Sequence, residues 1–339
     1  MKKALVVLAI FVFSFGAMLG CATKSSTSAS DAPARGAASA QPLDWPMKPI
    51  KLIVPFAASG GTDLGARLLA SYLEKDLGKP VVVENKVGGA GWVAYADLLN
   101  AKPDGYTFGV IVNPALITGY INPTANRTEN LDSFDHIINH AVDEGLIAVR
   151  PDDTRFANIN EFVEYAKKNE VSVTSNGVGS SNHLIALSMN KHLGTKFRFV
   201  QFTGTGEAVS SVLGNHVDVL IGEIGGAVEQ VKGGQFKALA VFGPERYPHL
   251  PDVPTMKEAV GFENTVTYAS RGIAGPKGID PQIVAKLQAA VEKAEKDPEF
   301  IKKASELGMT VDLTKGDAYE QLLKKQEAAI IELKPVLGW

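Results

Sequence analysis

Three short turns rich in small and polar residues follow predicted strands and precede predicted helices in this 339-residue chain. They occupy residues 57–63, 175–183 and 203–207. Such a turn aims free backbone N–H groups and the positive end of a helix dipole at one point, which suits an anion such as a carboxylate or phosphate. The first turn holds no evident nucleophile with a base beside it. We therefore interpret it as a site that captures an anion without chemistry on it.

The side chains of the turns could add hydroxyl and amide donors to the backbone N–H groups. In an open α/β sheet, ligands lie at the carboxyl ends of strands, so we expect the three turns to converge on one cleft. No Arg or Lys lies in these turns, so a bidentate arginine clamp is not expected. The alternative is ordinary loop structure with helix N-caps. The donors are Ser59, Thr62, Ser180, Ser181, Asn182, Thr203 and Thr205.

Other reactive residues give weaker signals. Asp63 is either an N-cap or a ligand contact, and His183 is either a polar helix-start residue or a ligand contact. His136 and His140 are four residues apart and could share a helix face, but they have no third ligand nearby in the sequence, so we predict no metal site.

Motifs for cofactors and for common enzymes are incomplete or missing. The glycines of residues 177–182 match only part of a dinucleotide fingerprint, and no acidic residue closes the next strand. The sequence contains no phosphate-loop lysine motif and no Gly-x-Ser-x-Gly nucleophile elbow. We predict no cofactor and no enzyme activity.

The N-terminus predicts export. Lys2 and Lys3 precede an apolar run of sixteen residues, too short for a spanning helix and typical of a signal peptide over residues 1–20. The run ends at Gly20-Cys21, which resembles a bacterial lipobox with Met18 where Leu is more usual. We predict lipidation of Cys21, the only cysteine of the chain. The alternative is an ordinary cleaved signal with an incidental cysteine.

Composition and length indicate how the remaining residues are organised and which partners are excluded. Residues 21–46 contain few apolar anchors and are predicted to form a flexible tether. The remaining length suits two lobes. Loss of Lys2 and Lys3 with the signal would take the formal charge from −3 to −5. No basic stripe appears, so we expect no nucleic-acid partner.

Strands and helices alternate through most of the chain, which predicts an α/β fold with largely parallel sheets. We expect a first lobe over residues 47–149, a second over 150–268, and a return to the first lobe over 269–339 with amphipathic C-terminal helices. The predicted strands are 50–54, 80–84, 106–112, 171–174, 197–202, 217–221 and 238–242, with a further strand within 137–149. The predicted helices include 63–77, 92–100, 160–169, 183–193, 207–213, 281–294, 299–307 and 317–333.

Seven short motifs, in order along nearly the whole predicted mature chain, resemble the substrate-binding proteins of the tripartite tricarboxylate transporter family, also called Bug-type receptors. They are Ile53-Val-Pro-Phe-Ala-Ala-Ser-Gly-Gly-Thr-Asp63 with Ala66-Arg67, Val82-Val-Glu-Asn85 with Gly88-Gly-Ala-Gly91, Pro103-Asp-Gly-Tyr-Thr107, Asn113-Pro-Ala-Leu116, Asn176-Gly-Val-Gly-Ser-Ser-Asn-His-Leu184, Leu213-Gly-Asn-His-Val-Asp218 and Leu250-Pro-Asp-Val-Pro-Thr255.

The resemblance implies a two-lobed type II periplasmic binding protein fold with the ligand cleft between the lobes. It implies capture of a small carboxylate and its delivery to a membrane permease of one large and one small subunit. We expect a lipid-anchored monomer outside the cytoplasm. The ligand contacts that it implies are Phe56, Ala57, Ser59, Gly60, Gly61, Thr62, Asp63, Ser180, Ser181, Asn182, His183, Thr203 and Gly204, with Asn113 as a further candidate.

Two departures from the family pattern concern this site. A stretch that often carries Trp before Gly is Tyr268-Ala-Ser-Arg-Gly272 here, and Gln201-Phe-Thr-Gly204 replaces a common Tyr-Lys-Gly. The identity of the ligand therefore cannot be transferred from relatives to this chain. Two other functions are compatible with the sequence: a receptor that signals to a membrane partner, and an extracytoplasmic enzyme on the same scaffold.

Overall fold

The computed structural model describes residues 43–202, 204–263 and 268–339. The predicted signal peptide, Cys21, most of the tether and Thr203 lie outside these ranges. The strands are β1 (Ile50–Val54), β2 (Val81–Asn85), β3 (Thr107–Asn113), β4 (Phe134–Val149), β5 (Glu170–Ser175), β6 (Lys196–Gln201), β7 (Val219–Glu223), β8 (Lys237–Val241), β9 (Tyr268–Pro276) and β10 (Thr310–Val311).

Eleven α-helices lie in the described residues, with short 3₁₀ turns that include η4 (Ile224–Gly226). Local signals set several helix ends: Asp280 caps α9 and Asp297 caps α10, each followed by proline in the first turn. The helices are α1 (Gly61–Leu77), α2 (Trp92–Leu99), α3 (Ala115–Ile121), α4 (Ile159–Lys168), α5 (Ser181–Leu193), α6 (Thr205–Leu213), α7 (Val228–Lys232), α8 (Met256–Val260), α9 (Pro281–Glu295), α10 (Pro298–Glu306) and α11 (Gly316–Leu337).

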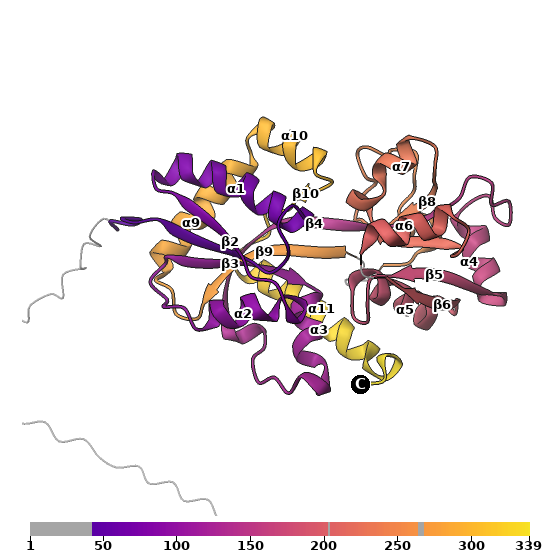
Figure 1. Cartoon of the computed structure of the whole chain (residues 1–339), viewed down its shortest axis with the longest axis horizontal. Coiled ribbons are helices and arrows are strands. Elements are labelled where there is room, and N and C mark those ends of the chain that lie inside the picture. Colours follow the sequence, from indigo (N-terminus) through magenta and orange to yellow (C-terminus); the bar gives the residue numbers. More distant parts are fainter. Residues whose placement is uncertain (1–42, 203, 264–267) are drawn as a thin grey trace, which may run out of the picture. The chain divides into compact units, whose positions relative to one another are not determined.

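The described strands pair in the order β2-β1-β3-β9-β4-β7-β5-β6, and β8 and β10 also pair with β4. We call β1, β2, β3, β9 and β10 with their helices the first lobe, and β5 to β8 with theirs the second lobe. The long strand β4 belongs to both: Phe134 to Glu144 pair with β9, and Gly145 to Val149 pair with β7. Figure 1 shows β4 and β9 side by side between the two groups of strands.

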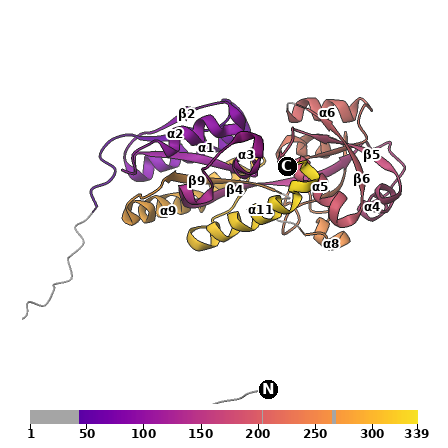
Figure 2. The ribbon, with the colours of Figure 1, turned by 90° about the horizontal axis from the view of Figure 1, so that it is seen from below.

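Both faces of the first-lobe strands are buried. Leu52 and Val54 of β1 pack in the core beneath α1, α9 and α10, whereas Ile53 between them packs in the core with α2, α3 and α11. Alternate residues of a strand point to opposite faces, so this continuous apolar run suits a central strand covered by helices on both sides. The helix α11 also reaches α5 of the second lobe, where Lys191 pairs with Glu332 (Figure 2).

Most predicted elements are confirmed, with ends shifted by one or a few residues. The strand at 50–54 is β1, and the helix predicted from residue 63 begins at Gly61. The prediction of largely parallel sheets is wrong at β4 and β9, whose pairings with each other, with β3 and with β7 are antiparallel. These strands connect the lobes instead of forming βαβ units. The predicted lobe boundaries remain a prediction.

Candidate functional site

A cavity of about 370 Å³ opens beyond the ends of β1, β3 and β5 and has walls from both lobes. That volume suits a small organic molecule. All three turns predicted from the sequence contribute to it, through Gly61, Ser180, Ser181 and Thr205. The lining residues are Phe56, Gly61, Val112, Pro114, Ala115, Asp143, Ser180, Ser181, Thr205, Glu223, Gly225, Gly226, Ala269, Arg271 and Leu307.

The first turn leads from β1 into α1, and no side chain caps that helix at Gly60. Asp63, buried in the first turn of the helix, accepts hydrogen bonds from the Ser59 backbone N–H at 2.8 Å, from Arg67 Nε at 3.0 Å and from Asn85 Nδ2 at 2.8 Å. Burial alone would raise the pKa of Asp63, but these hydrogen bonds outweigh it and lower the pKa. Asp63 therefore holds the turn in shape.

The second turn leads from β5 into α5, which Ser180 caps through His183 N–H. Asn182 Oδ1 accepts from the backbone N–H of Asn176 at 3.1 Å, so this side chain orders the loop. The His183 ring accepts the Gly179 N–H at Nδ1, 3.1 Å away, and burial lowers its pKa to about 4. The neutral ring is thus part of the loop structure, in agreement with the helix-start interpretation.

The third turn leads into α6, whose N-cap Gly204 provides no side-chain cap. Thr205 begins the helix and lines the cavity, and its Oγ1 lies 3.3 Å from Asn176 Nδ2 of the second turn. Ordinary helix capping accounts for the polar turn before α5. It does not account for the turns before α1 and α6, because these helices begin without a side-chain cap. Uncapped N-terminal N–H groups are available to an anionic ligand.

Arg271 of β9 supplies a guanidinium that the turns themselves lack. Its Nη2 donates to Asp143 Oδ2 of β4, and both residues are 8% exposed. Nε and Nη1 are buried without a hydrogen-bond partner in the described structure. The guanidinium also lies against the start of α1, since a Cβ built on Gly61 would be 3.3 Å from Nη2. The three turns contain no Arg or Lys, but the assembled cavity has this arginine of β9 in its wall.

The predicted contact residues fall into three groups. Phe56, Gly61, Ser180 and Ser181 line the cavity. Thr203 lies outside the described residues. The others surround the cavity without lining it: Ala57, Ser59 and Gly60 are exposed in the first turn, Thr62, Asp63, Asn113, Asn182 and His183 are buried, and Gly204 is the N-cap of α6. Their contact with a ligand remains a prediction.

Three charged residues of the cavity were missed from the sequence: Asp143, Glu223 and Arg271. They come from β4, β7 and β9, and no motif joins them. The one available signal was the departure from the family pattern in residues 268–272, which contains Arg271. Asp143 lies in a strand that was expected only to end the first lobe.

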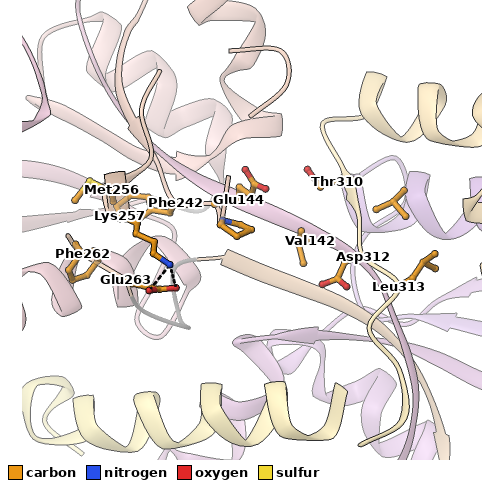
Figure 3. Close-up of a pocket in the computed structure, with 13 residues that line it drawn as sticks. Val142, Glu144, Phe242, Met256, Lys257, Phe262, Glu263, Thr310, Asp312 and Leu313 are labelled. Carbon is orange, nitrogen blue, oxygen red and sulfur yellow. Dashed lines mark hydrogen bonds and ion pairs between the residues drawn. The ribbon is translucent and has the colours of Figure 1, made fainter. Parts of the chain in front are cut away.

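A second cavity, of about 450 Å³, lies between β4, the segment after β8, α8 and β10 (Figure 3). Its walls include Glu144, Phe242 and the ion pair of Lys257 with Glu263. None of the described residues predicted to contact ligand lines it. Asp143 and Glu144, neighbours on β4, thus line different cavities. The cavity that contains the three turns is the candidate site.

Within residues 43–202, 204–263 and 268–339, no cluster of three or more His, Cys, Asp or Glu side chains is arranged to hold a metal ion. His136 and His140 lie on β4 and not on a helix. None of the helices in the same ranges combines the length and apolar character needed to cross a membrane.

Known proteins resemble this chain over most of its length. The family profile described as the tripartite tricarboxylate transporter family receptor, TctC, matches residues 65–334. A protein of Cupriavidus necator, described as the UPF0065 protein in the gbd 5' region, is 32% identical over 302 residues, which are 87% of this chain and 90% of the relative.

Two solved structures share the fold. The periplasmic binding protein BugD is 32% identical, with a TM-score of 0.70, over 87% of this chain and 99% of BugD. MatC of Rhodopseudomonas palustris, solved with bound malate, is 29% identical, with a TM-score of 0.68, over 86% of this chain and all of MatC. These likenesses confirm the predicted two-lobed α/β fold. The chain therefore belongs to the tripartite tricarboxylate transporter receptor family, whose members are periplasmic solute-binding proteins.

Proposed function

We propose that this protein captures a small carboxylate in the cavity between its lobes and delivers it to a secondary transporter of the tripartite tricarboxylate type. Arg271 is the observation that carries this proposal. Its Nε and Nη1 have no partner among the described residues, and its guanidinium lies against the uncapped start of α1 at Gly61. Guanidinium N–H groups without a protein partner, beside the backbone N–H groups of a helix start, are strong donors for a carboxylate.

The family adds support. MatC, a relative with 29% identity, holds malate, which is a dicarboxylate. The residues that we propose as ligand contacts are those predicted from the sequence, now joined by Arg271 and Thr205. Phe56, Gly61, Ser180 and Ser181 line the cavity and are the strongest of the predicted set.

We infer that binding works by a shift between open and closed arrangements of the lobes. The cavity walls include Gly61 and Phe56 of the first lobe and Ser181 and Thr205 of the second. A ligand that touches both walls binds better when the lobes are close together, so it raises the population of the closed state.

The N-terminus and the family support a proposal on location and partners. We propose a monomeric receptor outside the cytoplasm, anchored by a lipid on Cys21 after removal of residues 1–20. Its membrane partner would be a permease of one large and one small subunit. Mass spectrometry of the protein from membranes tests the anchor, since lipidation adds the mass of the acyl chains to a mature chain that begins at Cys21.

A thermal-shift screen of the purified protein against organic acids, amino acids, sugars and nucleotides tests the carboxylate. A ligand that binds only the native state adds about 2.7 kcal/mol of stability at a hundred-fold excess over its Kd. Shifts confined to carboxylates, with malate among the compounds tried, would support the proposal. Shifts confined to sugars or nucleotides would contradict it.

The role of Arg271 is tested by Arg271→Lys. Lysine keeps a positive charge for Asp143 but loses the planar fork of donors. We expect the affinity for the carboxylate to fall by about 10-fold to 100-fold, as for loss of a charge-assisted hydrogen bond. Arg198→Lys is the matched control, because Arg198 pairs with Glu170 on the exposed surface of the second lobe. Equal affinity in both variants would refute the assignment of Arg271.

A further inference from the structure

We propose that the ligand carries a cationic amino group in addition to its carboxylate, an inference that rests on the proposed function. The described residues that line the cavity include two carboxylates, Asp143 and Glu223, and one cation, Arg271. Arg271 already donates to Asp143. Among these lining residues, one negative charge is therefore left without a cation.

The carboxylate of Glu223 lies at the N-terminus of α5, where an anionic ligand group would be expected. Its Oε1 accepts the hydroxyl hydrogen bond of Ser181, the first residue of that helix. An anionic ligand group at this helix start would meet the chain's own carboxylate. The second-lobe wall therefore attracts a positive group at this point.

The first turns of the other two helices also contain a carboxylate. Asp63 lies in the first turn of α1 and Glu207 in the first turn of α6. The partial positive charge of a helix N-terminus is about half a charge, and at α1 Arg67 balances the charge of Asp63, so this helix start still attracts an anion. Among the described residues that line the cavity, Arg271 is the one side-chain cation that can attract a ligand carboxylate.

Asp143 and Glu223 lie on one face of the sheet. Glu223 of β7 pairs with Gly145 of β4, and Asp143 is two residues before Gly145, so its side chain points to the same face. Burial raises the pKa of Asp143, Arg271 opposes this, and the charge of Glu223 raises it further. A ligand ammonium between the two carboxylates would relieve their repulsion, whereas a second ligand carboxylate would increase it.

The cavity therefore suits a small zwitterion, such as an amino acid, with its carboxylate toward Arg271 and Gly61 and its ammonium toward Glu223. A ligand with carboxylates at both ends would leave one of them facing Glu223 and Asp143. The inference distinguishes a zwitterion from an acid without an amino group, and it does not depend on the size of the ligand's side chain.

Calorimetry of the full chain with matched pairs of acids tests this inference. Each pair differs by one amino group: acetate and glycine, succinate and aspartate, glutarate and glutamate, 3-phenylpropanoate and phenylalanine. We expect the amino-bearing member of the best-bound pair to bind at least about 10-fold more tightly, the size of one charge-assisted hydrogen bond. Glu223→Gln, which keeps an acceptor for Ser181, should remove most of that preference.

The control is Glu229→Gln on α7, whose carboxylate is exposed and pairs with Lys232. This variant should keep the preference. If acids without an amino group bind as tightly as their partners, or if Glu223→Gln leaves the preference unchanged, the inference is wrong and the carboxylate receptor stands. If no member of any pair binds and no carboxylate of the thermal-shift screen binds, the proposed function fails and the inference fails with it.

Discussion

Gly225 and Gly308 meet backbone against backbone at the edge of the candidate site. A Cβ built on Gly308 would lie 2.4 Å from the Cα of Gly225, closer than real Cβ contacts allow. Gly225 belongs to η4 and lines the cavity, and Gly308 follows α10 of the first lobe. Only glycine at residue 308 permits this approach, and its φ of +72° also favours glycine.

Gly308→Ala should weaken ligand binding by pushing the two segments apart. We expect the affinity to fall by about 10-fold or more. In the closed state the added methyl group would have to push the two backbone segments apart. Gly194→Ala is the matched control: its φ is +74°, but nothing lies within 4 Å of its built Cβ. Both variants carry the cost of a left-handed alanine, about 1 kcal/mol. Equal affinities in calorimetry would show that the Gly225–Gly308 contact is not needed for binding.

Asp63→Ala should loosen the first turn without removing a cavity wall. Asp63 is 1% exposed and bonds Ser59, Arg67 and Asn85. We expect a loss of about 2 kcal/mol in the free energy of unfolding, because buried partners lose their acceptor, together with weaker ligand binding. Urea unfolding and calorimetry measure the two effects. Asp97→Asn, at an exposed ion pair with Lys86, should change neither.

Glu144→Gln should remove a pH dependence of stability. Burial, with help from the charges of Asp143 and Glu245, raises the pKa of Glu144 to about 7 from an ordinary 4.5, and its Oε2 has no partner in the described structure. A raised pKa contributes stability that is complete below the unfolded value and is lost as pH rises through the folded value.

The parent protein should therefore lose up to about 3 kcal/mol of stability from this group between about pH 4.5 and pH 8. The Gln variant should unfold at a higher urea concentration than the parent near pH 8 and at a similar one near pH 4. A variant that tracks the parent at both pH values would mean that folding does not raise the pKa of Glu144.

His183→Asn should reduce sensitivity to acid. Burial lowers the pKa of His183 to about 4 from 6.5, and its Nδ1 accepts the Gly179 N–H. A lowered pKa of a base makes the charged form unfavourable in the fold, so stability is present above the unfolded value and is lost as pH falls toward the folded value. Asparagine keeps an acceptor but does not titrate. Between about pH 7 and pH 4, the midpoint temperature of thermal unfolding should fall less steeply in the variant than in the parent.

The sequence by itself determined the local architecture and the family. The strand 50–54, the glycine turn after it and the helix that ends before Gly78 are all confirmed, because apolar periodicity and glycine act over a few residues. The convergence of three such turns on one cavity was also predictable, since parallel strands present their carboxyl ends at one edge.

Only the tertiary structure decided the charges of the site. Arg271 and Asp143 are 128 residues apart in the chain, and Ser181 and Glu223 are 42 apart. Arg271 meets Asp143 because of the antiparallel register of β4 with β9, and Ser181 meets Glu223 because α5 packs against β7. Register between distant strands depends on the packing of the whole core, and no local pattern encodes it. For that reason the sequence predicted an anion site, whereas the fold revealed the carboxylates within it.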